Sequence, residues 1–139
     1  GFAADLTRTF SLGPADDPDY PHVWALVEAA NRLATAALRP GAKGVEVDAL
    51  ARDHIAAAGH GDHFGHGLGH GVGLDVHEAP RLSKTAGDAT LAAGNVVTVE
   101  PGVYLPGRFG VRIEDLVVVT PDGAELLSAA PKVTTVALR

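Results

Sequence analysis

Apolar residues recur every three to four positions in two stretches of the first half of the chain, which predicts two amphipathic helices. The first covers residues 21–38, with Asp19 as its N-cap, Pro21 in its first turn and Pro40-Gly41 ending it. The second covers residues 47–58, with Gly59 as its C-terminal cap. We expect both apolar stripes to face the core.

The remaining segments predict strands and loops. Residues 1–12 suit a strand that ends at Gly13-Pro14, whereas residues 60–73 are rich in Gly and His, and residues 81–94 form a connecting loop. Val-rich and Ile-rich runs predict strands at 96–100, 102–105 and 111–120, followed by a turn at 121–123 into residues 124–127. This order predicts an α+β fold in a single domain over residues 1–139.

Composition excludes several classes of function. The net charge is -6 and no basic stripe is visible, so we expect no nucleic-acid partner. No apolar run approaches the length of a membrane span, so we expect no membrane insertion. Cysteine is absent, which excludes thiolate metal sites and is consistent with a cytoplasmic location. The chain begins with Gly rather than Met, and we interpret it as a piece of a longer or processed protein.

Three short segments concentrate the chemistry: GHGVGLDVHE at 69–78, VEPGVY at 99–104 and VRIED at 111–115. They bring imidazoles and carboxylates onto backbone punctuated by Gly and Pro. Such a donor set suits a hard divalent metal ion, because buried carboxylates are costly unless they are paired or metal-bound. His70 and His77 are seven residues apart, which is not the i, i+4 pair of helical zinc peptidases.

Each acidic candidate has a simpler reading beside the functional one. Glu100 closes an apolar strand, where a salt bridge to Arg112 or Arg108 is the alternative to metal binding. Strand alternation places Glu114 on the same face as Arg112 and points Asp115 the other way, so we expect Asp115 to be structural or exposed. Asp5 could equally be an exposed aspartate at the edge of a strand.

These motifs, together with ADLTRTF at 4–10, resemble the pita-bread-fold metallopeptidases, and most closely the Xaa-Pro branch of prolidase and aminopeptidase P. The resemblance covers nearly the whole chain and corresponds to the C-terminal part of the catalytic domain, truncated on its N-terminal side. It implies metal ligands at Asp5, His70, Glu100 and Glu114. It also implies that His77 and His66 act on the substrate, that Arg112 contacts it, and that Glu100 relays a proton.

The resemblance further implies two divalent metal ions in the complete protein, acting on a peptide substrate through an activated water. Carboxylate-rich ligation favours Mn²⁺ or Co²⁺, and Zn²⁺ stays open. The family uses two aspartate ligands, and Asp5 matches only the second. We therefore expect a missing N-terminal segment to complete the site, and one ion or none, with poor activity, in this chain alone. By analogy with the branch, we also expect a homodimer.

Three alternatives stay open. A methionine aminopeptidase shares the fold, although HGLGH at 66–70 and the segment at 101–115 favour the Xaa-Pro branch. A non-catalytic pita-bread binding domain would not be expected to keep His70, His77, Glu100 and Glu114. A His-rich metal-binding module would account for the six histidines between His54 and His77 but not for the glutamates.

Overall fold

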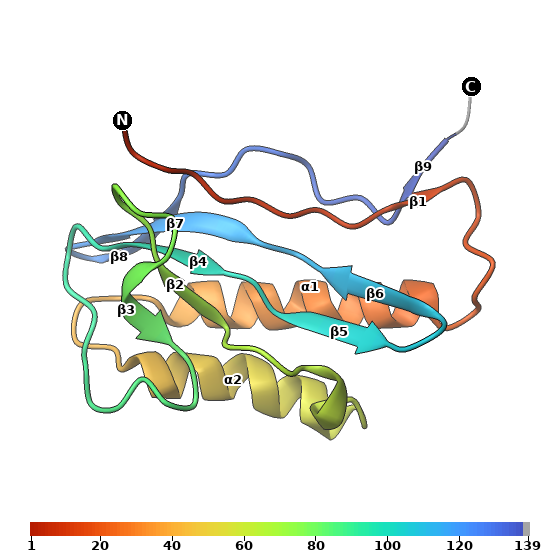
Figure 1. Cartoon of the computed structure of the whole chain (residues 1–139), viewed down its shortest axis with the longest axis horizontal. Helices are drawn as coiled ribbons and strands as arrows, with labels where there is room; N and C mark the ends of the chain where they lie inside the picture. The colour runs from red at the N-terminus through yellow and green to blue at the C-terminus, as the bar shows by residue number, and fades with distance from the viewer. Residues whose placement is uncertain (138–139) are drawn as a thin grey trace.

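The computed structural model describes residues 1–137, so the last two residues of the predicted single domain lie outside the described part of the chain. Two helices cover one face of an antiparallel sheet (Figure 1). Helix α1 spans Tyr20–Ala37 and α2 spans Gly44–Ala57, close to the predicted ranges. Gly59 has a positive φ of 85°, as expected for the predicted C-terminal cap.

The main sheet has five strands in the order β3-β2-β4-β7-β8, and its ladders are antiparallel. Its strands are β2 (Gly69–Gly71), β3 (Glu78–Leu82), β4 (Val96–Val99), β7 (Asp115–Thr120) and β8 (Gly123–Leu126). A separate hairpin pairs β5 (Gly102–Leu105) with β6 (Phe109–Arg112). The mixture of helices with an antiparallel sheet confirms the predicted α+β class.

Two short strands and one turn of 3₁₀ helix complete the fold. β1 (Ser11–Leu12) pairs in parallel with β9 (Thr135–Val136), and η1 (Gly61–His63) follows α2. The N-terminal and C-terminal segments run together along the side of the sheet away from the helices (Figure 1). The first and last described segments therefore lie on the face that the helices leave open.

The core lies between the helices and the sheet. Val27, Ala30 and Ala34 of α1 are fully buried, as are Val97 and Val99 of β4. These positions recur at helical spacing in α1, which is why this face of the helix packs against the sheet. Among residues 1–137, no helix is both long and apolar enough to cross a membrane.

Three predicted elements were wrong in detail. Residues 111–120 form two strands rather than one, because the ladder breaks at Ile113 and Glu114. Residues 1–12 form a strand only at Ser11–Leu12, although an isolated bridge also joins Thr7 to Glu114. The loop predicted at 81–94 begins inside β3, whose alternating burial is that of a half-exposed edge strand.

Candidate metal centre

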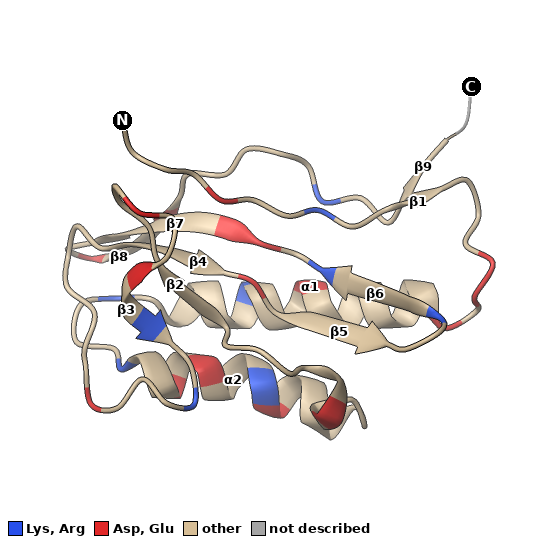
Figure 2. Cartoon of the chain, viewed as in Figure 1, with Lys and Arg blue, Asp and Glu red and all other residues tan. Residues whose placement is uncertain are grey.

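Two glutamates occupy the gap between two β-ladders. The β4–β7 ladder ends at the pair Val99 and Asp115, whereas the β5–β6 ladder begins at Gly102 and Arg112. Glu100 and Glu114 lie between these pairs, one on each side of the break. Figure 2 shows acidic positions where β4 and β7 approach the β5–β6 hairpin. Neither glutamate belongs to either ladder, although an isolated bridge joins Glu114 to Thr7.

His70 on β2 faces these carboxylates. Its Nε2 lies 3.1 Å from Glu100 Oε1 and 3.8 Å from Asp5 Oδ2. Its Nδ1 lies 3.0 Å from the Gly71 carbonyl oxygen. A carbonyl only accepts hydrogen bonds, so Nδ1 carries a proton and Nε2 is the atom that faces the acids. Neutral imidazole would then set its lone pair against a carboxylate oxygen, which requires a cation between them, either a proton or a metal ion.

The donor atoms converge closely enough for a metal ion. Ligand atoms of His70, Glu100 and Glu114 all lie within 4.8 Å of one another, and so do those of Asp5, His70 and His77. His70 belongs to both groups. Imidazole together with carboxylates is a donor set that binds divalent ions, and the residues present therefore fit a divalent metal.

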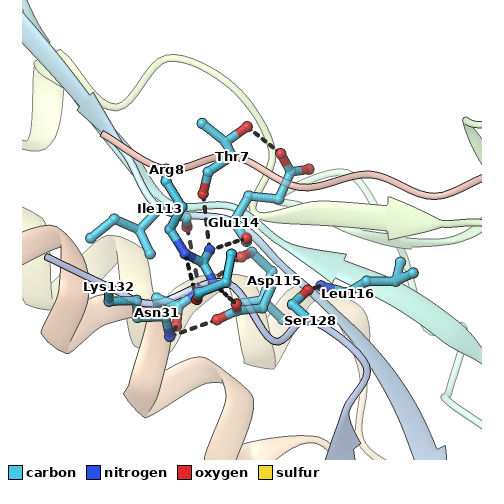
Figure 3. Close-up of polar contacts among 11 residues, drawn as sticks. Thr7, Arg8, Asn31, Ile113, Glu114, Asp115, Leu116, Ser128 and Lys132 are labelled. Atoms are coloured by element: carbon cyan, nitrogen blue, oxygen red, sulfur yellow. Dashed lines mark hydrogen bonds and ion pairs between the residues drawn. The ribbon is translucent and has the colours of Figure 1, made fainter. Parts of the chain in front are cut away.

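Glu114 is a buried carboxylate with one strong local partner. Its side chain is 2% exposed, and the Thr7 hydroxyl donates a short hydrogen bond to its Oε2 (Figure 3). Burial raises the pKa of Glu114, and the nearby charges of Glu100 and Asp5 raise it further, against the Thr7 hydrogen bond and the Arg112 charge. The acids at the centre thus repel one another, and a bound cation would relieve that repulsion.

Two threonines align the ligands. Thr98 Oγ1 donates to Glu100 Oε1 at 3.0 Å and accepts the His70 backbone N–H at 3.1 Å. Arg112 Nε donates to Thr7 Oγ1 at 3.2 Å, so the hydroxyl that bonds Glu114 is itself held. Each threonine therefore connects a metal-ligand candidate to a neighbouring strand or segment, the arrangement that fixes ligand orientation in metal sites.

A cavity of about 640 Å³ opens beside the ligands and is lined in part by His66, His70, His77, Glu100 and Arg112. His77 is exposed, and its ring centroid lies 4.4 Å from that of His70. The cavity is open to solvent on the side of His77. Its size suits a small substrate adjacent to the carboxylates.

His66 is held in one orientation at the cavity wall. Its Nδ1 lies 2.8 Å from the Gly67 carbonyl oxygen, and its Nε2 lies 2.6 Å from the Tyr104 hydroxyl oxygen. Nδ1 is therefore the donor, and Nε2 accepts from Tyr104. Burial is the largest cause of a raised pKa of Tyr104, which keeps this hydroxyl protonated as a donor.

The structure places the predicted ligands Asp5, Glu100 and Glu114 around His70, and His66, His77 and Arg112 line the cavity beside it. Their individual roles stay predictions. Among the described residues, Glu100 makes no ion pair with arginine, and Asp5 faces His70 rather than open solvent on all sides. Asp115 is 1% exposed and pairs with Arg8 and Lys132, which agrees with a structural role.

Sequence reasoning missed Thr7, Thr98 and Tyr104. The sequence held one usable signal, because Thr98 is a polar residue inside the apolar run VVTV of β4. In the structure it is completely buried. Thr7 and Tyr104 carry no comparable signal. Their partners, Glu114 and His66, are distant along the chain and meet them only in the folded molecule.

The α+β fold and the cluster of imidazole and carboxylate groups place this chain in the class of proteins whose metal centres are bound by histidine and carboxylate side chains. The sequence model of metallopeptidase family M24 matches residues 1–121, and the chain belongs to this family. The family is a dinuclear metal-dependent one. The predicted resemblance is thereby confirmed.

Relatives agree in sequence and in structure. The chain is 48% identical over 132 residues to the uncharacterised peptidase YqhT of Bacillus subtilis, covering 95% of this chain and 37% of YqhT. It superposes on an Xaa-Pro dipeptidase from Bacillus anthracis with a TM-score of 0.93 and 41% identity, covering 99% of this chain and 38% of the other. An X-Pro aminopeptidase from Thermotoga maritima matches with a TM-score of 0.91 and 39% identity, covering 99% and 38%. The fold is therefore the pita-bread fold, and the chain spans little more than a third of the length of these relatives.

Proposed function

We propose that the protein carrying this chain is a metal-dependent exopeptidase that cleaves Xaa-Pro bonds in dipeptides or at peptide N-termini. The observation that carries the proposal is that His70, beside an open cavity, belongs to two groups of converging ligand atoms, one with Asp5 and His77 and one with Glu100 and Glu114. Relatives named Xaa-Pro dipeptidase and X-Pro aminopeptidase support the substrate class. Dipeptide and longer peptide substrates both remain candidates.

We propose that the same four residues hold two divalent ions, Mn²⁺ or Co²⁺, together with a further carboxylate from outside these 139 residues. The limited coverage of the relatives supports the idea of such an outside ligand. When bound, the ions would polarise the scissile carbonyl and acidify a water molecule. A homodimer and a cytoplasmic location stay predictions.

The chain's own residues would then handle protons and substrate. Glu100 has its Oε1 engaged by Thr98 and His70, so its Oε2 is available to take a proton from the attacking water. His77, exposed at the cavity, would donate to the oxygen on which negative charge develops. His66 and Arg112, on the cavity wall, would orient the substrate.

The test compares Glu114→Gln with Glu125→Gln in the purified natural protein, after chelation and reloading with Mn²⁺. Glu125 is exposed on β8, so its change is the matched control. We expect Glu114→Gln to lower hydrolysis of an Xaa-Pro dipeptide or tripeptide by at least about 100-fold, above the usual effect of an outer-shell partner. Wild-type rates in Glu114→Gln, or wild-type activity with no metal at all, would overturn the proposal.

A further inference from the structure

At the break between the two ladders, two buried backbone carbonyls beside the glutamates are bonded by a side chain. Val99 immediately precedes Glu100, and Ile113 immediately precedes Glu114. Across the break the strands are joined by a long bond of 3.4 Å from the Ile113 N–H to the Pro101 oxygen. Buried carbonyls at such a break need other hydrogen-bond donors. A donor that holds these two carbonyls also fixes the peptide groups that lead into Glu100 and Glu114.

Asn31 of α1 supplies that partner for both carbonyls. Its Nδ2 donates to the Val99 oxygen at 2.9 Å and to the Ile113 oxygen at 3.3 Å. Lys132 Nζ donates to Asn31 Oδ1 at 2.8 Å. An ammonium only donates and a carbonyl only accepts, so these partners fix which way the amide points. One side chain, 1% exposed, thus ties the helix to both ligand-bearing segments.

The hydrogen bonds of Asn31 connect through Lys132 to a largely buried network of charged residues (Figure 3). Lys132 Nζ lies 2.6 Å from Asp115 Oδ2 in an ion pair, and Arg8 Nη2 donates to Asp115 Oδ1 at 2.7 Å. Arg8 Nη1 also donates to the Glu114 carbonyl at 2.6 Å. The backbone around Glu114 is therefore held at Ile113 by Asn31 and at Glu114 itself by Arg8.

We infer that Asn31 is a positioning residue that sets the separation of the Glu100 and Glu114 carboxylates and hence the affinity of the centre for a divalent ion. This inference rests on the proposed metal centre. Asn31 touches neither carboxylate. It acts through the two peptide groups that carry them, and metal affinity falls when ligands are held less well in place.

The position of Asn31 in its helix supports a specific role. It interrupts the apolar face formed by Val27, Ala30 and Ala34, where an apolar residue would fill the space without bonding to backbone. An amide with its hydrogen-bonding partners satisfied is tolerated there, and this one bonds the two carbonyls next to the ligands. General helix packing does not require that choice.

The experiment measures Mn²⁺ binding by isothermal titration calorimetry in the natural protein. Asn31→Leu has similar volume but loses the hydrogen bonds, and Val23→Ala, buried on the same helix two turns earlier, is the control for lost packing. We expect Asn31→Leu to bind Mn²⁺ about 10-fold to 100-fold more weakly, with Val23→Ala unchanged. We also expect the KM for peptide to hold while kcat falls, because Asn31 does not line the cavity that would bind the peptide.

Two further variants make each result decisive. Glu114→Gln removes a ligand, so wild-type Mn²⁺ affinity in that variant refutes the metal centre itself. Loss of affinity in Glu114→Gln, with wild-type affinity in folded Asn31→Leu, refutes the positioning role alone. Should Asn31→Leu not fold, Lys132→Met decides: it frees the Asn31 oxygen, and a fall in Mn²⁺ affinity supports the inference, whereas unchanged affinity overturns it.

Discussion

Replacing Asp48 with alanine tests whether a buried ion pair anchors the loop that carries His66. Asp48 is 1% exposed and accepts two hydrogen bonds from Arg52, each of 2.8 Å, as well as the Leu68 backbone N–H at 3.0 Å. Arg52 also donates to the carbonyls of Phe64, at 2.9 Å, and His66, at 2.8 Å. One carboxylate and one guanidinium thus hold residues 64–68 against α2.

The magnitude follows from what Asp48→Ala leaves behind. The Arg52 side chain is only 12% exposed, so its charge would stay largely buried without a counter-ion. Breaking one partner of a buried pair costs about 3–5 kcal/mol, more than the pair itself contributes over an apolar replacement. The Leu68 N–H would also lose its partner. We therefore expect a loss of about 3–5 kcal/mol in the free energy of unfolding.

Urea titration followed by the fluorescence of Trp24 measures this loss, since Trp24 is 9% exposed and the chain has no other tryptophan. Asp53→Ala, on the exposed side of the same helix, is the control and should change stability by less than about 0.5 kcal/mol. A loss below about 1 kcal/mol in Asp48→Ala would refute the reasoning, because it would mean that Arg52 finds water or another partner at little cost.

Two further changes test the close approach of strands and the acid end of the stability curve. A Cβ at Gly69 would lie 1.9 Å from the Thr98 carbonyl oxygen, so Gly69→Ala should lower the free energy of unfolding by about 1–3 kcal/mol or more, whereas Gly123→Ala, with open space around it, should not. The hydrogen bond from Arg108 holds the pKa of Asp17 below its ordinary value of 3.8, so the stabilisation is present above that value and is lost as pH falls through the lower folded pKa. In urea midpoints measured from about pH 5 to about pH 2, Arg108→Gln should differ from wild type at the upper end and converge with it at the lower end; a constant difference contradicts the assignment.

Helices were predictable from sequence because their signals are local. The apolar period of α1, the stop at Pro40-Gly41 and the cap at Gly59 depend on neighbouring residues, and each appears where it was predicted. The strand at 96–100 and the hairpin strand at 102–105 were also found, since a Pro-Gly dipeptide separates two apolar runs.

The break at Ile113 and Glu114 could not be predicted in the same way. Residues 111–114 alternate apolar and charged side chains and residues 116–119 are all apolar, and both patterns are typical of a strand. What divides them is the ladder partner: β6 pairs with β5, but β7 pairs with β4 and β8. Strand pairing is a long-range property, so apolar periodicity does not report the break.

The candidate ligands were found because their residue types cluster in short motifs, but their supporting residues were not. Thr7, Thr98 and Asn31 are all common residue types. Thr7 and Asn31 lie far along the chain from the groups they bond, whereas Thr98 bonds the nearby Glu100 as well as the more distant His70. Thr98 and Asn31 each place a polar residue inside an apolar pattern, which is a signal that the sequence shows, whereas Thr7 carries no such signal. Such interruptions therefore indicate residues that bond the backbone or side chains of candidate ligands.

The break that sequence analysis missed is also what forms the site. A continuous ladder would pair Glu100 and Glu114 within it and alternate their side chains across the sheet. At the break, the Glu100 N–H bonds Leu68 and the Glu114 N–H bonds Thr7. The carbonyls of Val99 and Ile113 accept from Asn31, and both carboxylates lie near His70. That gathering opposes folding, since burial and neighbouring acids raise the pKa of Glu114. A divalent ion that binds only the folded chain would offset this repulsion, and its binding would therefore stabilise the fold.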